Sequence, residues 1–258
     1  MQNNKKIYFA SDVHLGHPDI EKARWRERLF VKWLDEIKTD AAEIYLVGDI
    51  FDFWYEYKKV VPRGFVRTLG KIAEITDMGI PVHFFTGNHD IWVTDYLPAE
   101  LGVILHRGPI EKEFAGKQFY IAHGDGLGPG DKSYKLLKKV FTNKAMQWMF
   151  SRLHPNFAIS LAHYHSNSSR QSQGYKPSTF NGENKEILYR YAKNLVQTKP
   201  YDYLIFGHRH LMVNMKISEN SRYINLGDWL YHFSYGVFDG KEFQLLNYHK
   251  VKPDKNNT

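Results

Sequence analysis

Five short apolar stretches of the chain are each followed, within a few residues, by side chains that can bind a metal ion or carry a proton. The stretches cover residues 7–10, 44–47, 82–85, 119–122 and 203–206, and the residues that follow are Asp12, His14, Asp49, Asn88, His89, Asp90, His123, His208 and His210. Such apolar runs predict buried parallel strands, and in open α/β sheets ligands bind beyond the carboxyl ends of the strands. We therefore expect these side chains to meet at one edge of a sheet.

Taken one at a time, each of these residues has a simpler explanation. A single Asp after a strand is most often a turn residue or a helix N-cap, because its carboxylate accepts hydrogen bonds from nearby backbone N–H groups. Carboxylate, amide and imidazole groups that converge on one sheet edge have no such common explanation. A site for divalent cations requires that mixture, so the sequence predicts a metal centre.

The ordered motifs resemble those of the calcineurin-like metallophosphoesterases. They are Asp12-x-His14, Gly48-Asp49, Gly87-Asn88-His89-Asp90, His123-Gly124 and Gly207-His208-x-His210, in family order across residues 7–210. The resemblance implies an α/β fold, a four-layer αββα sandwich, with two divalent metal ions. It also implies that one ion binds Asp12, His14 and His210, that the other binds Asn88, His123 and His208, and that Asp49 bridges them. For oxygen and imidazole ligands without a thiolate, Mn²⁺ is the first choice, with Fe and Zn as alternatives.

His89 and Asp90 are the expected catalytic residues. If Asn88 binds metal, the adjacent His89 cannot easily point the same way and is better placed to meet the phosphoryl group, where donors must face developing charge. Asp90 is expected to hold His89 from behind. No Ser or Cys is placed to form a covalent intermediate, so the expected nucleophile is hydroxide generated on the metal ions.

Composition limits the class of protein. The 258 residues, 43% of them hydrophobic, suffice for one large α/β domain, and we expect no second domain. The chain contains no cysteine, which excludes disulfides and a zinc finger. No signal peptide is evident, and no apolar run approaches the roughly 20 residues that cross a bilayer. The net charge of +7 favours an anionic partner, which can be nucleic acid, anionic lipid or a phosphorylated small molecule.

Further elements must position these residues. Apolar residues at helical spacing predict helices at about 20–37, 63–78 and 184–197, and residues 103–105 predict a minor strand. Residues 51–57 form an aromatic segment directly after Asp49. We expect this segment either to line the site or to pack beneath the next helix.

Residues 126–182 depart from the strand–helix pattern and are too long for a simple crossover. We expect a helical cap over the site, inserted in a single domain of residues 1–258. Apolar residues such as Leu136 and Trp148 and basic residues such as Lys135 and Lys139 occur in it at helical spacing. A basic amphipathic helix can lie on an anionic membrane surface, and it can equally pack its apolar side on the sheet domain.

The cap and three motifs resemble one branch of the family, the UDP-2,3-diacylglucosamine diphosphatases of lipid A biosynthesis. The motifs are Ser11-Asp12-Val13-His14-Leu15, Gly48-Asp49-Ile50-Phe51-Asp52-Phe53-Trp54 and Leu226-Gly227-Asp228-Trp229. The resemblance implies hydrolysis of a nucleotide-lipid pyrophosphate to UMP and 2,3-diacylglucosamine 1-phosphate in the cytoplasm, with peripheral contact to the inner membrane left open. The expected substrate contacts are Asp131, Tyr134, Asn167 and Arg170, and no nucleic-acid partner is expected.

Two alternatives stay open. His89 stands where the best-known members of that branch carry Arg, and Leu211 follows the paired histidines where a proline is common. The second candidate is therefore another phosphodiesterase or pyrophosphatase that acts on a nucleotide conjugate. The third is a protein that keeps the metal site only as a scaffold for protein partners, which the complete ligand set and His89 argue against.

Overall fold

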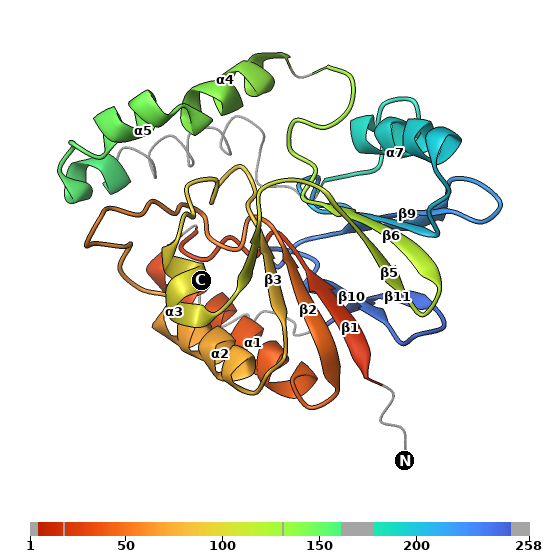
Figure 1. The fold of residues 1–258 in the computed structure, drawn as a ribbon, viewed down its shortest axis with the longest axis horizontal. Coiled ribbons are helices and arrows are strands. Elements are labelled where there is room, and N and C mark those ends of the chain that lie inside the picture. Colours follow the sequence, from red (N-terminus) through yellow and green to blue (C-terminus); the bar gives the residue numbers. More distant parts are fainter. Residues whose placement is uncertain (1–4, 18, 131, 161–177, 249–258) are drawn as a thin grey trace.

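Two β-sheets form the centre of the molecule in a computed structural model, which describes residues 5–17, 19–130, 132–160 and 178–248 (Figure 1). The first sheet has the order β11-β10-β1-β2-β3-β4 and the second has the order β5-β6-β7-β9-β8. The first contains β1 (Lys6–Ala10), β2 (Ala41–Val47), β3 (Val82–Phe85), β4 (Ile104–His106), β10 (Ser234–Phe238) and β11 (Phe243–Asn247). The second contains β5 (Ile110–Phe114), β6 (Lys117–Ala122), β7 (Tyr203–Phe206), β8 (Met212–Lys216) and β9 (Arg222–Leu226).

The five predicted strands are present and lie in the parallel parts of the two sheets. β1, β2, β3 and β4 run parallel in one sheet, and β6, β7 and β9 run parallel in the other. Their last residues are almost all fully buried, which agrees with continuous apolar runs in the sequence. The polar residues that follow these strands are therefore delivered to the same end of both sheets.

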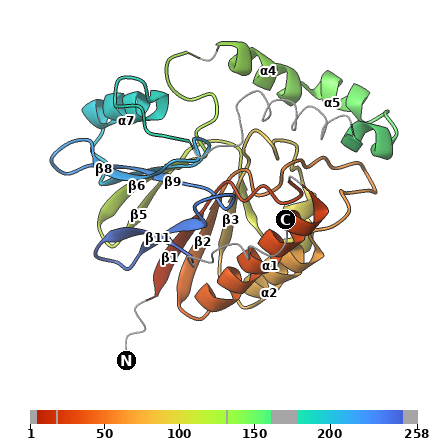
Figure 2. The same cartoon turned by 180° about the vertical axis from the view of Figure 1, so that it is seen from behind.

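Helices cover the outer faces of both sheets (Figure 1, Figure 2). α1 (Ile20–Ile37), α2 (Val66–Asp77) and α3 (Tyr96–Leu101) cover the first sheet, and α7 (Ile187–Thr198) covers the second. Apolar side chains fill three layers: between the first helices and their sheet, between the two sheets, and between the second sheet and α7. The predicted four-layer αββα sandwich is confirmed.

The helix boundaries agree with the sequence spacing to within a few residues. α1 has the predicted limits, and the Asp19 side chain caps it by accepting a hydrogen bond from the Lys22 N–H at 2.8 Å. α2 begins three residues later than predicted, because Phe65 adopts a left-handed backbone conformation with φ of 60° immediately before it. The minor strand is present as β4, one residue further along the chain.

The aromatic segment after Asp49 packs beneath the next helix over part of its length. Phe51 and Trp54 are fully buried, and their rings contact Phe65 at the start of α2. Tyr55 is also buried but contacts Phe150, which belongs to the cap. The packing alternative is therefore correct for Phe51 and Trp54, and Tyr55 connects the rim of the sheet domain to the cap.

The cap contains α4 (Lys132–Thr142) and α5 (Lys144–Phe150), which extend over the strand ends (Figure 1, Figure 2). The Trp92 indole N–H donates a hydrogen bond to the carbonyl of Phe141 at 2.7 Å, and the Tyr55 hydroxyl donates one to the carbonyl of Gln147 at 2.9 Å. The rings of Phe141 and Phe150 also contact Trp92, whereas other apolar side chains of these helices stay exposed: Leu136 is 66% exposed and Met149 is 57% exposed. In the described part of the chain, none of the helices combines the length and apolar character needed to cross a membrane.

Candidate metal centre

The residues at the strand ends have an unusual backbone conformation. Asp12, His14, Asp49, His208 and His210 all have φ between 47° and 64°, and among the described non-glycine residues only Phe65, Ala115 and Phe233 share a positive φ. A left-handed conformation costs a non-glycine residue about 1–3 kcal/mol. Residues in such conformations are found mainly at functional sites. The strain therefore marks five of the seven residues expected as metal ligands, and Asn88 and His123 do not share it.

Two glycines allow these strand ends to approach one another. A Cβ atom on Gly87 would clash with the carboxylate of Asp49, and a Cβ atom on Gly207 would clash with the Ser11 hydroxyl and the Asp12 carboxylate. The Ser11 hydroxyl donates a hydrogen bond to Asp12 at 2.6 Å. The glycines in Gly87-Asn88 and Gly207-His208 thus make room for the neighbouring carboxylates.

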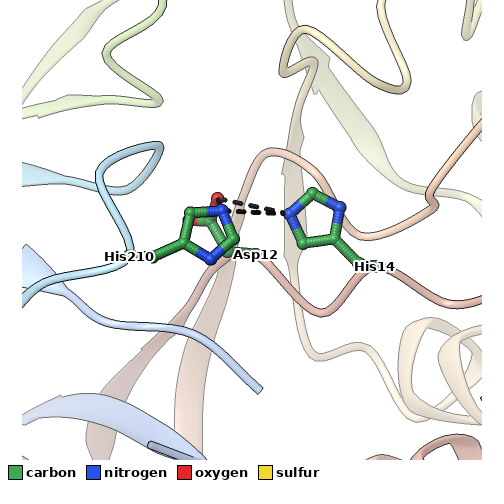
Figure 3. A group of neighbouring side chains, drawn as sticks. All are labelled: Asp12, His14 and His210. Atoms are coloured by element: carbon green, nitrogen blue, oxygen red, sulfur yellow. Dashed lines mark hydrogen bonds and ion pairs between the residues drawn. The ribbon is translucent and has the colours of Figure 1, made fainter. Parts of the chain in front are cut away.

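The first cluster joins Asp12, His14 and His210 (Figure 3). The Asp12 Oδ1 atom lies 3.3 Å from His210 Nε2 and 3.7 Å from His14 Nε2, and the two Nε2 atoms are 3.3 Å apart. The Asp12 and His14 side chains are almost completely buried, and that of His210 is 25% exposed. Three ligand atoms therefore face one point that is open on the His210 side.

The second cluster joins Asp49, His123 and His208. His123 Nε2 lies 3.3 Å from Asp49 Oδ2, and the Asn88 amide oxygen lies 2.9 Å from His208 Nδ1. The same Asp49 oxygen is 3.9 Å from His14 Nε2 in the first cluster. The structure thus brings together all seven residues expected as ligands, with Asp49 between the clusters.

Burial and neighbouring charges set the protonation of these groups. Burial opposes a charged Asp49, but His123 and His89 outweigh it and hold the pKa of Asp49 well below its usual range. Burial also opposes a charged His123, but Asp49 outweighs it and raises the pKa of His123 to about 10. The pKa of His208 falls to about 3, through burial first and the charge of His123 second. Metal binding at this pair requires His123 to lose its proton.

The donor set fits divalent metal ions. Asp12 Oδ1 and His123 Nε2 are buried and make no hydrogen bond within the described part of the chain, although both point into the clusters. A buried polar atom without a partner costs free energy, and a coordinated cation removes that cost. Carboxylate oxygen, amide oxygen and imidazole nitrogen are suitable ligands for Mn²⁺, Fe or Zn²⁺.

His89 lies beside the clusters, but Asp90 does not hold it. The Asp90 carboxylate is fully buried and accepts backbone hydrogen bonds from Gly87 at 2.7 Å and Ile50 at 2.8 Å. His89 Nδ1 instead lies 2.9 Å from the backbone oxygen of Asp52 and 3.7 Å from its carboxylate. The expectation that Asp90 orients His89 is therefore wrong, because the Asp90 carboxylate is occupied by the loop that follows β2. Asp52 takes that place.

The expected substrate contacts can be located in part. The Tyr134 hydroxyl donates a hydrogen bond to Asp125 at 2.7 Å, and its ring centroid lies 6.3 Å from that of His208. Tyr134 therefore connects α4 to the second cluster. Asp131, Asn167 and Arg170 lie outside the described residues. Asp52 and Asp125 had no predicted role, although Asp52 stands in one of the motifs and Asp125 follows His123-Gly124.

Comparisons with known proteins identify the family of the chain. Residues 5–212 match the family described as "Calcineurin-like phosphoesterase". The chain is 43% identical over 253 residues to a "UDP-2,3-diacylglucosamine hydrolase" of Porphyromonas gingivalis, with 93% of this chain and 96% of the relative covered. It is 28% identical over 229 residues to a protein of the same name from Histophilus somni, with 87% and 92% covered. Because the family match spans most of the chain and includes every strand end of the two clusters, the chain belongs to the calcineurin-like phosphoesterase family.

Proposed function

We propose that the protein hydrolyses the pyrophosphate of UDP-2,3-diacylglucosamine and releases UMP and 2,3-diacylglucosamine 1-phosphate. The observation that carries this proposal is the 43% identity to a hydrolase named for that substrate, across 93% of this chain. Because the match covers 93% of this chain, it also includes the cap. The reaction is a step in making lipid A.

We propose that two dications occupy the clusters, with Mn²⁺ as the first choice. Asp12, His14 and His210 would hold one ion, Asn88, His123 and His208 the other, and Asp49 would bridge them. Two dications carry a charge of about +4 and the two aspartates about −2, so the centre attracts a phosphate ester. When bound, the ions supply Lewis acidity and lower the pKa of water toward neutrality.

We propose that His89 assists the reaction and that Asp52 orients it. His89 Nδ1 lies 2.9 Å from the Asp52 backbone oxygen, and an N–H at that position would fix the ring. The other ring nitrogen is then available to the substrate, where a protonated form can donate to a phosphoryl oxygen or to the leaving group. The side chain is 21% exposed, so a substrate can reach it.

The cap supplies the apolar surface that a diacyl substrate requires. Leu136, Val140 and Met149 are exposed on α4 and α5, and burial of acyl chains against such side chains is worth about 0.8 kcal/mol per CH₂ group. Lys135 and Lys139 lie on α4 and suit an anionic headgroup region. We propose that the same surface makes peripheral contact with the cytoplasmic face of the membrane, with Tyr134, Asp131, Asn167 and Arg170 as contacts to sugar and phosphates.

The deciding experiment compares UDP-2,3-diacylglucosamine with UDP-N-acetylglucosamine in the Mn²⁺-loaded protein. We expect a much larger kcat/KM for the diacylated substrate, because only its acyl chains can use the cap. Leu136→Glu should reduce that preference without changing the slow rate on a generic aryl phosphodiester. Equal kcat/KM values for the two nucleotides would favour the general nucleotide pyrophosphatase, and no turnover of any phosphodiester would favour the scaffold.

A further inference from the structure

The motif Leu226-Gly227-Asp228-Trp229 follows β9 and has no role in the ligand set. Asp228 is fully buried within it. Its Oδ2 atom lies 3.5 Å from His210 Nδ1 and 3.0 Å from His232 Nδ1. His210 is one of the three residues of the first cluster, so Asp228 contacts the metal centre through the nitrogen of His210 that does not face Asp12.

The carboxylate of Asp228 is held in place by the turn that follows it. Its Oδ1 atom accepts hydrogen bonds from the backbone N–H groups of Leu230 at 2.8 Å, Tyr231 at 2.6 Å and His232 at 3.2 Å. The N–H of Trp229 donates a hydrogen bond to the backbone oxygen of Asp12 at 3.0 Å. One turn thus fixes both the carboxylate beside His210 and the backbone of Asp12.

A fixed carboxylate at this place determines which nitrogen of His210 carries the proton. A carboxylate accepts a hydrogen bond, so the ring places its N–H on Nδ1 and leaves the lone pair of Nε2 free. Nε2 is the atom that lies 3.3 Å from Asp12 Oδ1 and faces the cluster. We propose that Asp228 is a positioning residue that keeps His210 in the form, and at the angle, needed to bind the metal ion shared with Asp12 and His14.

In the second cluster, the acceptor that faces His123 Nδ1 is not a carboxylate. The proposed role of Asp228 therefore applies to the first cluster alone. His123 Nδ1 lies 2.8 Å from the backbone oxygen of Val47, which is a neutral acceptor. His14 in the first cluster resembles His210 instead, because its Nδ1 lies 3.5 Å from the Asp52 carboxylate. Both histidines of the first cluster are therefore backed by buried carboxylates. Loss of Asp228 should weaken the ion of the first cluster and leave the other in place.

The test is Asp228→Asn, studied by metal titration without substrate. The amide oxygen can keep the backbone hydrogen bonds, but the amide NH₂ group then faces Nδ1–H of His210 and cannot accept from it. We expect the affinity for one of two Mn²⁺ ions to fall by about 10- to 100-fold, the usual effect of losing such a partner, and the other to stay unchanged. His232→Ala is the matched control, since it removes the other imidazole from the same carboxylate and should leave both affinities intact.

A spectroscopic measurement covers the case in which Asp228→Asn does not fold. In the wild-type protein loaded with Zn²⁺, histidine-ring ¹⁵N NMR should show His210 protonated at Nδ1 and coordinated through Nε2. The opposite tautomer, or two unchanged Mn²⁺ affinities in Asp228→Asn, would overturn the proposal. The inference rests on the proposed metal assignment but not on the lipid substrate, so failure to hydrolyse UDP-2,3-diacylglucosamine would leave a positive titration result standing.

Discussion

His89 differs from the histidines of the two clusters in the direction of its contacts. Its backbone N–H donates a hydrogen bond to Asp49 Oδ1 at 2.8 Å, and its ring meets that of His14 edge-on at 4.8 Å. The ring therefore lies against the expected ligands, although the family resemblance does not count His89 among them. His14, Asp49 and His89 also offer ligand atoms within 4.8 Å of one another, so this placement allows His89 either to contact the substrate or to bind an ion, and the metal content of a His89 variant separates the two roles.

Replacement of His89 by Ala should lower kcat by about 10²-fold or more, because one donor to the developing phosphoryl charge is lost. The Mn²⁺ content should stay at two ions per chain, as measured by elemental analysis of the same samples. His106→Gln, which removes a histidine from the edge strand β4, serves as the matched control and should keep full activity. Near-normal turnover by His89→Ala with both ions bound would remove His89 from the reaction.

At the residue scale, the sequence predicts which residues gather at the strand ends but not the contacts that hold them there. Asp12, His14 and Asp49 could be found because each follows an apolar strand in a recognisable order. Their positive φ values depend on loops that pack against each other across the strand ends, and no spacing rule predicts them. The contact between His89 and Asp52 was missed for the same reason: the sequence neighbour Asp90 is the obvious partner, and only the folded chain shows that Asp90 is occupied.

At the scale of elements, three neighbouring strands carry a chain of ionisable side chains that is separate from the expected metal ligands. His83 on β3 lies 2.9 Å from His106 on β4 and 3.1 Å from the carboxylate of Glu43 on β2. Burial first, and the charge of His83 second, lower the pKa of His106 from 6.5 to about 4. The edge strand β4 is thus attached to the sheet partly through a neutral imidazole.

This arrangement predicts a pH dependence of stability. Between about pH 6.5 and pH 4 the unfolded His106 binds a proton that the folded His106 does not, so the free energy of unfolding should fall as the pH falls through that window. Above pH 6.5 the effect should vanish. Urea unfolding of the wild type and His106→Gln at several pH values would measure this dependence. The contribution of the metal-centre residues to the pH dependence is the same in both proteins and cancels when the two are subtracted. Equal slopes for the two proteins would contradict the lowered pKa.

The limits of the elements could be predicted where the pattern is long and regular, as in α1. The packing of a segment and the exact start of a helix could not be predicted where tertiary contacts determine them. The side chains of the aromatic segment at 51–57 are similar in type but pack in two places. Phe51 and Trp54 pack in the core, and Tyr55 contacts the cap. The start of α2 also depends on the left-handed Phe65, whose ring packs on Phe51.

At the scale of the whole molecule, the metal centre lies where the two sheets meet. Asp12 and Asp49 follow strands of the first sheet, whereas His123 and His208 follow strands of the second. Ions bound to both groups would connect the sheets in the folded state only. The centre should therefore contribute to the stability of the molecule as well as to its chemistry.

Removal of the ions with a chelator should abolish activity and lower the melting temperature, and added Mn²⁺ should restore both. Free Mn²⁺ at 100 times its Kd corresponds to about 2.7 kcal/mol of stabilisation for one site. Differential scanning calorimetry of chelated and reloaded protein measures the shift. Asp49→Ala should bind no more than one ion tightly and show a smaller shift on reloading; full activity in that variant would exclude Asp49 as the bridge.

The left-handed backbone lowers the stability of the fold at residues that the metal site requires. These residues are Asp12, His14, Asp49, His208 and His210. Glycine would relieve the strain at each position, and with it about 1–3 kcal/mol of conformational cost, but it would delete the side chain for which the strain exists. Removal of these buried and closely spaced charged side chains would also favour the stability of the metal-free fold. In the absence of metal, directed evolution of this protein for heat resistance alone would therefore enrich variants that lack these side chains, and any such selection must include Mn²⁺ or be paired with an assay for metal content.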